Sequence, residues 1–152
     1  MSESAAETEK RDQFERRQFD FWIGEWDCRW DGGEGSNTIV AELDGMVILE
    51  RFDGRPGTPL LGLSLSVYDD AAAVWRQAWA DSSGTYLDFV GTFADGVMDL
   101  RREATSADGA PLTQRMRFTE IAAERLVWLW ERRRAGSTEW DVLWRIDYTR
   151  RA

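Results

Sequence analysis

The chain has 152 residues, a net charge of -9 and no histidine, with Cys28 as its one cysteine and Lys10 as its one lysine. These absences exclude an imidazole base, a Ser-His-Asp triad, His-ligated zinc or haem, an internal disulfide and Schiff-base chemistry in the core. The negative charge also disfavours nucleic acid and anionic membrane surfaces, so we expect no metal, no cofactor and neither of those partners.

The first eleven residues are small, polar and acidic, and they lack the apolar segment of a signal peptide. We expect residues 1–11 to be a disordered tail and residues 12–152 to form one domain. No apolar run approaches the length needed to span a bilayer, which predicts a cytoplasmic protein. The preference for arginine over lysine, with many alanines and glycines, is typical of a GC-rich bacterial genome.

An aromatic segment follows this tail. A short helix is expected over residues 13–19, with Phe14 and Phe21 near one face. Residues 19–23 are nearly all apolar, whereas from Glu25 onward Trp26, Cys28 and Trp30 alternate with charged residues. Alternation places successive side chains on opposite faces of a strand. We therefore predict a plug that closes one end of the fold, followed directly by the first strand.

The same alternation, interrupted by glycine-containing turns, continues along the chain. Strands are predicted over residues 25–30, 37–43, 46–52, 60–68, 74–81, 85–93, 97–104, 112–119, 125–132 and 139–150. About ten evenly spaced strands, without a helix long enough for a crossover, predict an all-β fold: one antiparallel up-and-down barrel, whose closure removes exposed edges. The proline- and glycine-rich segment 53–59 is expected to form a mobile lip at the open end.

Gly24-Glu25-Trp26 opens the first strand and resembles the G-x-W motif of the lipocalins and the wider calycin group. In that group the tryptophan packs at the closed end under an arginine from near the end of the last strand. The resemblance implies this role for Trp26, with Arg145 or Arg150 as its partner. Together with Trp75-Arg76-Gln77-Ala78-Trp79-Ala80-Asp81 and Asp147-Tyr148-Thr149-Arg150, it makes residues 14–150 similar to a family of small bacterial lipocalin-like proteins. Haem-binding barrels of similar strand number use a histidine ligand, which this chain lacks.

Trp75, Gln77, Trp79 and Asp81 share one face of a predicted strand. Two indole rings need shelter, so we expect this face to point inward and to carry the amide and the carboxylate with it. The functional interpretation is a ligand wall, in which the indoles stack on a planar or apolar molecule while Gln77 and Asp81 hold its polar end. The alternative is that Asp81 caps the turn at residues 82–84 and the indoles fill a dry core.

Glu50 lies on a mostly apolar strand face, but the opposite face is also partly apolar, so the orientation stays open. If Glu50 points inward, it and Asp81 form a candidate acid/base pair, with Tyr148 as a further proton donor. If it points outward, Glu50 pairs with an arginine at the surface. Further candidate ligand contacts inside the barrel are Asn37, Gln114, Trp130 and Trp144. Cys28, flanked by indoles, is expected to be a small buried hydrophobe.

Three functions fit these patterns. The leading hypothesis is a barrel that binds a small hydrophobic or aromatic ligand in a Trp-lined cavity. The second is a cofactor-independent enzyme (a cyclase, isomerase or hydrolase of bacterial specialised metabolism) that uses Asp81, Glu50 or Tyr148 for proton transfer. The third is a filled barrel that serves as a structural or interaction protein. The sequence also leaves open whether the protein forms a homodimer.

Overall fold

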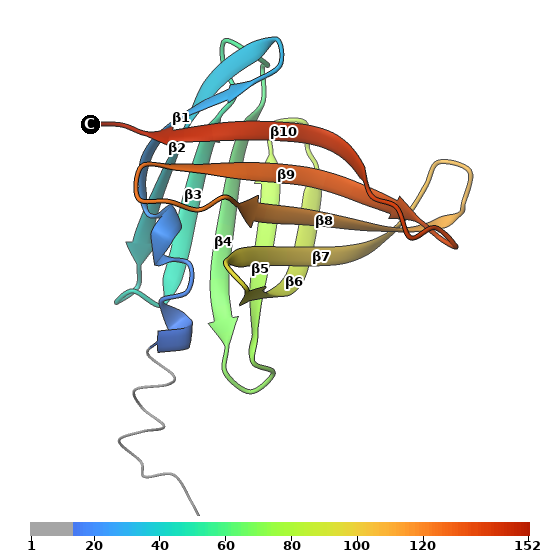
Figure 1. The fold of residues 1–152 in the computed structure, drawn as a ribbon, viewed down its shortest axis with the longest axis horizontal. Helices are drawn as coiled ribbons and strands as arrows, with labels where there is room; N and C mark the ends of the chain where they lie inside the picture. The colour runs from blue at the N-terminus through green and yellow to red at the C-terminus, as the bar shows by residue number, and fades with distance from the viewer. Residues whose placement is uncertain (1–13) are drawn as a thin grey trace, which may run out of the picture.

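The alternating segments form ten antiparallel strands in the computed structural model, which describes residues 14–152 (Figure 1). The strands are β1 (Gly24–Trp30), β2 (Gly33–Glu42), β3 (Val47–Asp53), β4 (Leu61–Asp69), β5 (Val74–Asp81), β6 (Tyr86–Ala94), β7 (Val97–Thr105), β8 (Pro111–Thr119), β9 (Arg125–Arg134) and β10 (Asp141–Arg150). Each strand pairs with its neighbours in sequence, and β10 pairs with β1, where Tyr148 lies opposite Cys28. The predicted all-β, up-and-down barrel is confirmed.

Strand β2 begins four residues before the predicted start. The glycines at positions 32, 33 and 35 are typical of a flexible turn, yet residues 33–36 pair with residues 27–30 of β1. A Cβ atom on Gly33 would lie 2.4 Å from the Trp30 indole nitrogen, so glycine lets the ring pack over the strand. The turn itself shrinks to Asp31 and Gly32, and Gly32 adopts a φ of +84°, which favours glycine.

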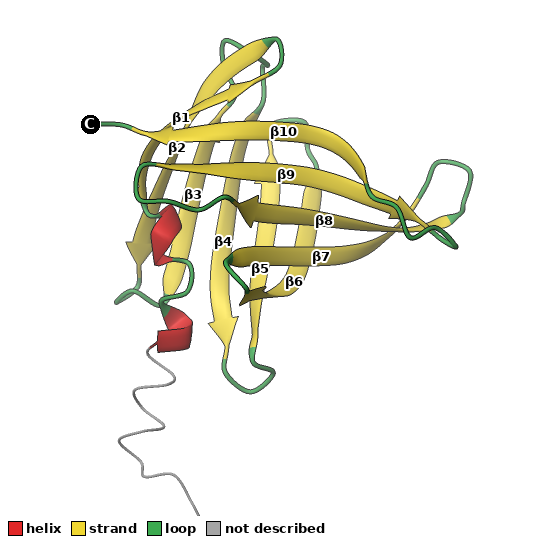
Figure 2. Cartoon of the chain, viewed as in Figure 1, coloured by secondary structure: helices red, strands yellow, loops and turns green. Residues whose placement is uncertain are grey.

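The N-terminal segment closes one end of the barrel. One α-helical turn at residues 14–16 precedes a 3₁₀ helix, η1 (Asp20–Trp22), and both lie across the barrel end (Figure 2). Phe19 and Trp22 are fully buried and stack with ring centroids 5.0 Å apart, and Phe118 packs edge-on against both. Phe14, expected to cover this end, is instead 72 % exposed. The tail predicted for residues 1–11 lies outside the described residues.

Arg150 fastens the plug to the last strand. Its guanidinium lies 4.2 Å from the centre of the Trp26 ring and donates hydrogen bonds to the carbonyl oxygens of Ile23 (2.7 Å), Phe21 (3.1 Å) and Ala123 (2.9 Å). Of the two arginines implied by the resemblance, Arg150 therefore covers Trp26, whereas Arg145 pairs with Asp147 on the outside. Within residues 14–152 we find no helix with the length and apolar character of a membrane span.

Strand β4 turns its leucines outward. Leu61, Leu63, Leu65 and Val67 are exposed, while Gly62, Ser64, Ser66 and Tyr68 face the interior. The interior needs small residues here, because a Cβ atom on Gly62 would lie 2.0 Å from the Trp79 ring. The interior also needs hydroxyl groups, because Ser64 and Ser66 bond to the buried polar side chains of Glu50 and Gln77. Packing and polar pairing inside the barrel thus override the usual burial of leucine.

Candidate functional site

A cavity of about 190 Å³ lies inside the barrel between the plug and the open end. Its lining consists of Trp22, Glu50, Phe52, Leu60, Gln77, Trp79, Asp81, Leu87, Phe89, Met116, Phe118, Trp128, Trp130, Trp144, Ile146 and Tyr148. The residues at the plug end are buried, whereas Leu60, Trp79, Leu87 and three further tryptophans are half-buried. These half-buried side chains surround the mouth.

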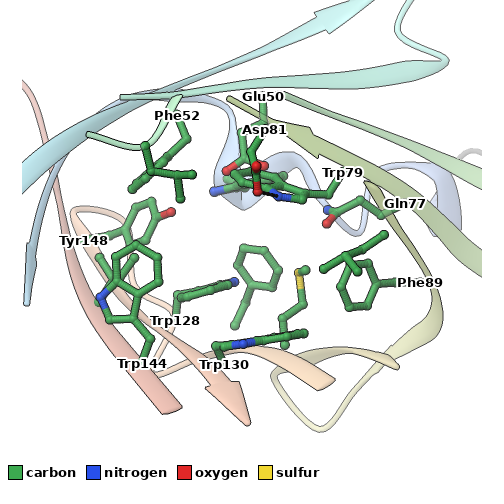
Figure 3. Close-up of a pocket in the computed structure, with 16 residues that line it drawn as sticks. Glu50, Phe52, Gln77, Trp79, Asp81, Phe89, Trp128, Trp130, Trp144 and Tyr148 are labelled. Atoms are coloured by element: carbon green, nitrogen blue, oxygen red, sulfur yellow. Dashed lines mark hydrogen bonds between the residues drawn. The ribbon is translucent and has the colours of Figure 1, made fainter. Parts of the chain in front are cut away.

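Aromatic rings form most of the cavity wall (Figure 3). Trp79 from β5 lies along one wall with the polar side chains of Glu50, Gln77 and Asp81, while Trp128, Trp130 and Trp144 from β9 and β10 lie along the wall opposite. The rings of Trp128 and Trp144 meet edge-on at 5.9 Å, an arrangement that aromatic pairs favour. Five of the nine tryptophans line this one space.

Glu50 points into the barrel and is only 6 % exposed, so the surface alternative for this residue does not hold. Its carboxyl group accepts hydrogen bonds from the Ser64 hydroxyl (2.6 Å) and the Asn37 amide (2.7 Å). Burial raises the pKa of Glu50 to about 7, and these two hydrogen bonds offset only part of the rise. A carboxyl group that exchanges its proton near neutral pH therefore lines the cavity.

Tyr148 extends the polar network around Glu50. The Asn37 amide nitrogen also donates to the Tyr148 hydroxyl at 2.8 Å, so one amide bridges the carboxyl group and the phenol. Burial raises the pKa of Tyr148 well above its usual value, and the nearby Cys28 and Glu50 add to the effect. Burial likewise raises the pKa of the Cys28 thiol, although a hydrogen bond with Tyr148 opposes it. Tyr148 thus stays protonated, and Cys28 is no nucleophile.

Asp81 combines both roles considered for it. Its side chain lines the cavity mouth and accepts a hydrogen bond from the Trp79 indole at 2.9 Å. It also caps the following turn, because it accepts bonds from the backbone N–H groups of Ser83 (2.9 Å) and Thr85 (3.4 Å). Burial raises the pKa of Asp81, but the hydrogen bonds from Ser83 and Trp79 outweigh this and leave it lowered. Asp81 is therefore ionised at neutral pH and orients Trp79, which leaves Glu50 as the group suited to carry a proton.

Gln77 is buried at the cavity wall between the plug and Trp79. Its amide nitrogen donates to the Ser66 hydroxyl at 3.0 Å, which fixes the amide plane against β4. This bond uses one of the two amide hydrogens, so the second N–H and the carbonyl oxygen of Gln77 are available to a ligand. Gln77, Trp130 and Trp144, all predicted ligand contacts, line the same cavity.

Three predicted ligand contacts lie away from the cavity. Trp75 packs at the closed end against Phe19, and its indole donates to Gln18 at 3.1 Å. Asn37 is buried behind Glu50 and Tyr148, where it supports the network without lining the cavity. Gln114 accepts a hydrogen bond from Arg102 at 2.5 Å, two positions beyond Met116 toward the open end. Each of these three side chains points into the barrel, but it lies too near one end of the barrel or behind another side chain to reach the cavity.

Several lining residues were not among the predicted contacts. Trp22 belongs to the plug, whose folding into the barrel end brings this ring to the cavity floor. Leu87 and Phe89 come from β6. The alternation of apolar and polar residues is weak in this strand, because Val90 on the opposite face is apolar as well. Trp22 also has a buried indole N–H without a partner among the described residues. No sequence signal marks such an unsatisfied donor.

The predicted lip, residues 53–59, lies at the open end next to Leu60. The Gly57 amide donates to the Glu34 carbonyl at 2.9 Å, and the Trp30 ring fills the space beside Gly57, where a Cβ atom would lie only 2.4 Å away. Further backbone bonds join Gly54 to Leu60 and Thr58. The segment is thus docked on the β1–β2 hairpin, and its mobility stays a prediction.

The described residues contain no group of three or more histidine, cysteine, aspartate or glutamate side chains placed to hold a metal ion. No protein-family model matches the chain, and no curated protein sequence matches it. The geometry of the cavity and its polar groups therefore provides the basis for a functional proposal.

Proposed function

We propose that the protein binds a small aromatic or apolar molecule in the Trp-lined cavity, as a lipocalin-like barrel of the bacterial cytoplasm. The observation that carries this proposal is the gathering of five indole rings around one space. The arrangement of Arg150 over Trp26 supports the lipocalin-like assignment.

The cavity volume limits the size of the ligand. An apolar cavity of about 150 Å³ holds one benzene molecule. The 190 Å³ measured here leaves room for one aromatic ring with a short substituent. The Gln77 amide and the Glu50 carboxyl lie on one wall, where the amide N–H or the protonated carboxyl can donate to a carbonyl group on that ring and their oxygens can accept from a hydroxyl group. Phenols, benzyl alcohols and aryl ketones are ligands of this kind.

Replacing Leu87 by tryptophan is expected to block the mouth, because Leu87 lines the cavity beside Trp79, its register partner on the neighbouring strand. Affinity for a single-ring ligand such as acetophenone or p-cresol should fall by more than about tenfold in isothermal titration calorimetry. Thr92→Trp is the matched control, since Thr92 is exposed on the outer face of the same strand. If no single-ring compound binds the wild type, or if both variants lose affinity alike, the proposal is wrong.

A second candidate function is cofactor-independent proton transfer in the same cavity, of the kind that a cyclase, isomerase or hydrolase performs. The observation that favours it is Glu50, whose pKa is raised to about 7 by burial where a ligand would lie. Asn37 suits both protonation states of Glu50: its amide nitrogen donates to the carboxylate, and turning the amide over presents Oδ1, which has no partner among residues 14–152, to the protonated acid.

Deuterium exchange separates this candidate from simple binding. In deuterated water, the wild type should incorporate deuterium next to the carbonyl of a bound alkyl aryl ketone, as followed by NMR. Glu50→Gln should keep the affinity but slow the exchange by about 100-fold or more. Binding without any exchange in the wild type would leave the protein a carrier.

A further inference from the structure

An apolar face covers the outside of the barrel across four strands. It consists of Leu49 from β3, Leu61, Leu63, Leu65 and Val67 from β4, Ala78 and Ala80 from β5, and Tyr86 and Val90 from β6; we call it the leucine face. The four large residues of β4 are each 39–50 % exposed, and Tyr86 is 65 % exposed. Isolated apolar residues are common on surfaces, but a continuous apolar face of this kind marks an interaction site.

The two borders of the leucine face differ in shape. From the β3 border a surface groove of about 440 Å³ extends across β4 to the end of β5, and its lining includes Arg51, Leu61, Leu63 and Ala80 together with Asp53 and Asp81. On the β6 border the ring of Tyr86 stands out from the barrel. Arg51, Leu63, Ala80 and Tyr86 lie in one row of the strand register, so the hollow and the protruding ring are at the same height along the barrel.

The borders also differ in charge. Arg51 lies on the β3 border, and Asp88 lies on the β6 border, one row away. Both are exposed, and neither forms an ion pair with another residue in the described part of the chain. Two further charged residues at the face already have partners: Arg76 pairs with Asp69 at 2.9 Å, and Asp53, opposite Leu61, pairs with Arg55 at 2.9 Å. The leucine face thus has a groove beside the unpaired Arg51 at its β3 border and the protruding Tyr86 ring near the unpaired Asp88 at its β6 border.

We propose that the leucine face is a homodimer interface whose occupant is a second copy of this chain. A two-fold axis that runs along the strands between β4 and β5 places the β3 border of each copy on the β6 border of the other. Tyr86 of each copy then enters the groove beside Arg51 in the other, and Asp88 meets the same arginine. The face is self-complementary in shape and in charge, which a two-fold interface requires.

The size of the face sets the expected strength of the dimer. Four strands about 4.8 Å apart, with about four outward positions along each, give a projected face of roughly 20 Å by 20 Å. Specific interfaces of standard size cover about 800 Å² of accessible surface on each partner, so a face of this extent falls below that size, among the weak and transient contacts. We expect a dissociation constant in the micromolar range and a folded, stable monomer.

Sedimentation equilibrium between about 1 µM and 500 µM tests the proposal, since this range brackets a micromolar dissociation constant. The wild type should shift from monomer to dimer, and Leu65→Glu should weaken the dimer by about 100-fold or more. Leu43→Glu is the matched control, because Leu43 is 74 % exposed in the β2–β3 turn, outside the face. A wild type that stays monomeric throughout, or a dimer that Leu65→Glu leaves intact, overturns the proposal.

Charge reversal tests the pairing of the borders without placing a charge in the apolar face. Arg51→Asp and Asp88→Arg should each weaken the homodimer by about tenfold, because each creates two like-charged contacts across the axis. An equal mixture of the two variants should form a heterodimer about as stable as the wild-type dimer. If the mixture gains no stability over the separate variants, the proposed orientation is wrong.

Discussion

Between pH 4 and pH 8 the wild type is expected to lose about 3 kcal/mol of unfolding free energy that the Glu50→Gln variant keeps. Burial raises the pKa of Glu50 from its ordinary 4.5 to about 7 in the folded protein. Below pH 4.5 both folded and unfolded chains hold the proton. Between pH 4.5 and 7 the folded protein still holds it while the unfolded chain releases it, so stability falls as the pH rises. Above pH 7 the loss is complete.

Urea denaturation of both proteins at pH 4, 6 and 8 measures this difference. Glutamine has the size of the protonated acid, and its side-chain oxygen can accept from the Asn37 amide nitrogen, which bonds to Glu50 in the wild type. Glu42→Gln is the matched control for the substitution itself, since Glu42 is exposed at the end of β2, away from the cavity. A pH-independent difference for Glu50→Gln would show that Glu50 is not held neutral by burial.

Arg150→Ala is expected to lower the unfolding free energy by about 3 kcal/mol, because it removes three charge-assisted hydrogen bonds and the cation–π contact with Trp26. The three carbonyl groups belong to Phe21, Ile23 and Ala123, so one side chain joins the plug, the β8–β9 loop and the last strand. Arg150→Lys should recover only part of the loss, since a single ammonium group cannot reach all three carbonyls.

Thermal and urea denaturation compare this variant with Arg145→Ala. Arg145 forms an exposed ion pair with Asp147 at 3.0 Å, and its removal should cost less than about 1 kcal/mol. Because Arg145 and Arg150 lie on the same strand, the comparison separates the plug contact from a general loss of charge. Equal effects of the two variants would mean that the plug does not depend on Arg150.

The barrel could be predicted because its signals are local. Alternation from Trp26 to Trp30 and the short glycine-containing turns each depend on a few neighbouring residues. At Asp95-Gly96, for instance, both residues have positive φ, the geometry that a two-residue hairpin needs. Ten alternating segments joined by short turns leave few topologies other than an up-and-down barrel.

The inward faces were harder to predict, because partners from distant strands decide them. Alternation in β4 separates Leu63 and Leu65 from Ser64 and Ser66 but does not say which set is buried. A general preference for buried leucine gives the wrong answer, since Trp79 needs the space above Gly62 and Glu50 needs the hydroxyl of Ser64. The same long-range pairing settles the orientation of Glu50.

The sequence also did not reveal how far along the barrel axis a residue lies. Trp75 and Trp79 lie on one face of β5, yet only Trp79 reaches the cavity, because Trp75 is covered by the plug residue Phe19. Periodicity gives the face of a strand and not the depth at which a residue meets the space inside. The sequence therefore predicts correctly which face of β5 lines the cavity, but it includes Trp75, which lies beyond the cavity floor.

The nine indole N–H signals offer a site-resolved test of ligand binding in the cavity. In ¹⁵N-labelled protein titrated with p-cresol or acetophenone, the signals of the five lining tryptophans, at positions 22, 79, 128, 130 and 144, should shift together and saturate. The signals of Trp26, Trp30, Trp75 and Trp140, which lie outside the cavity lining, should stay nearly unchanged. Shifts at these four positions alone, or no saturable shift at any of the nine with any single-ring ligand, would contradict a ligand-binding cavity.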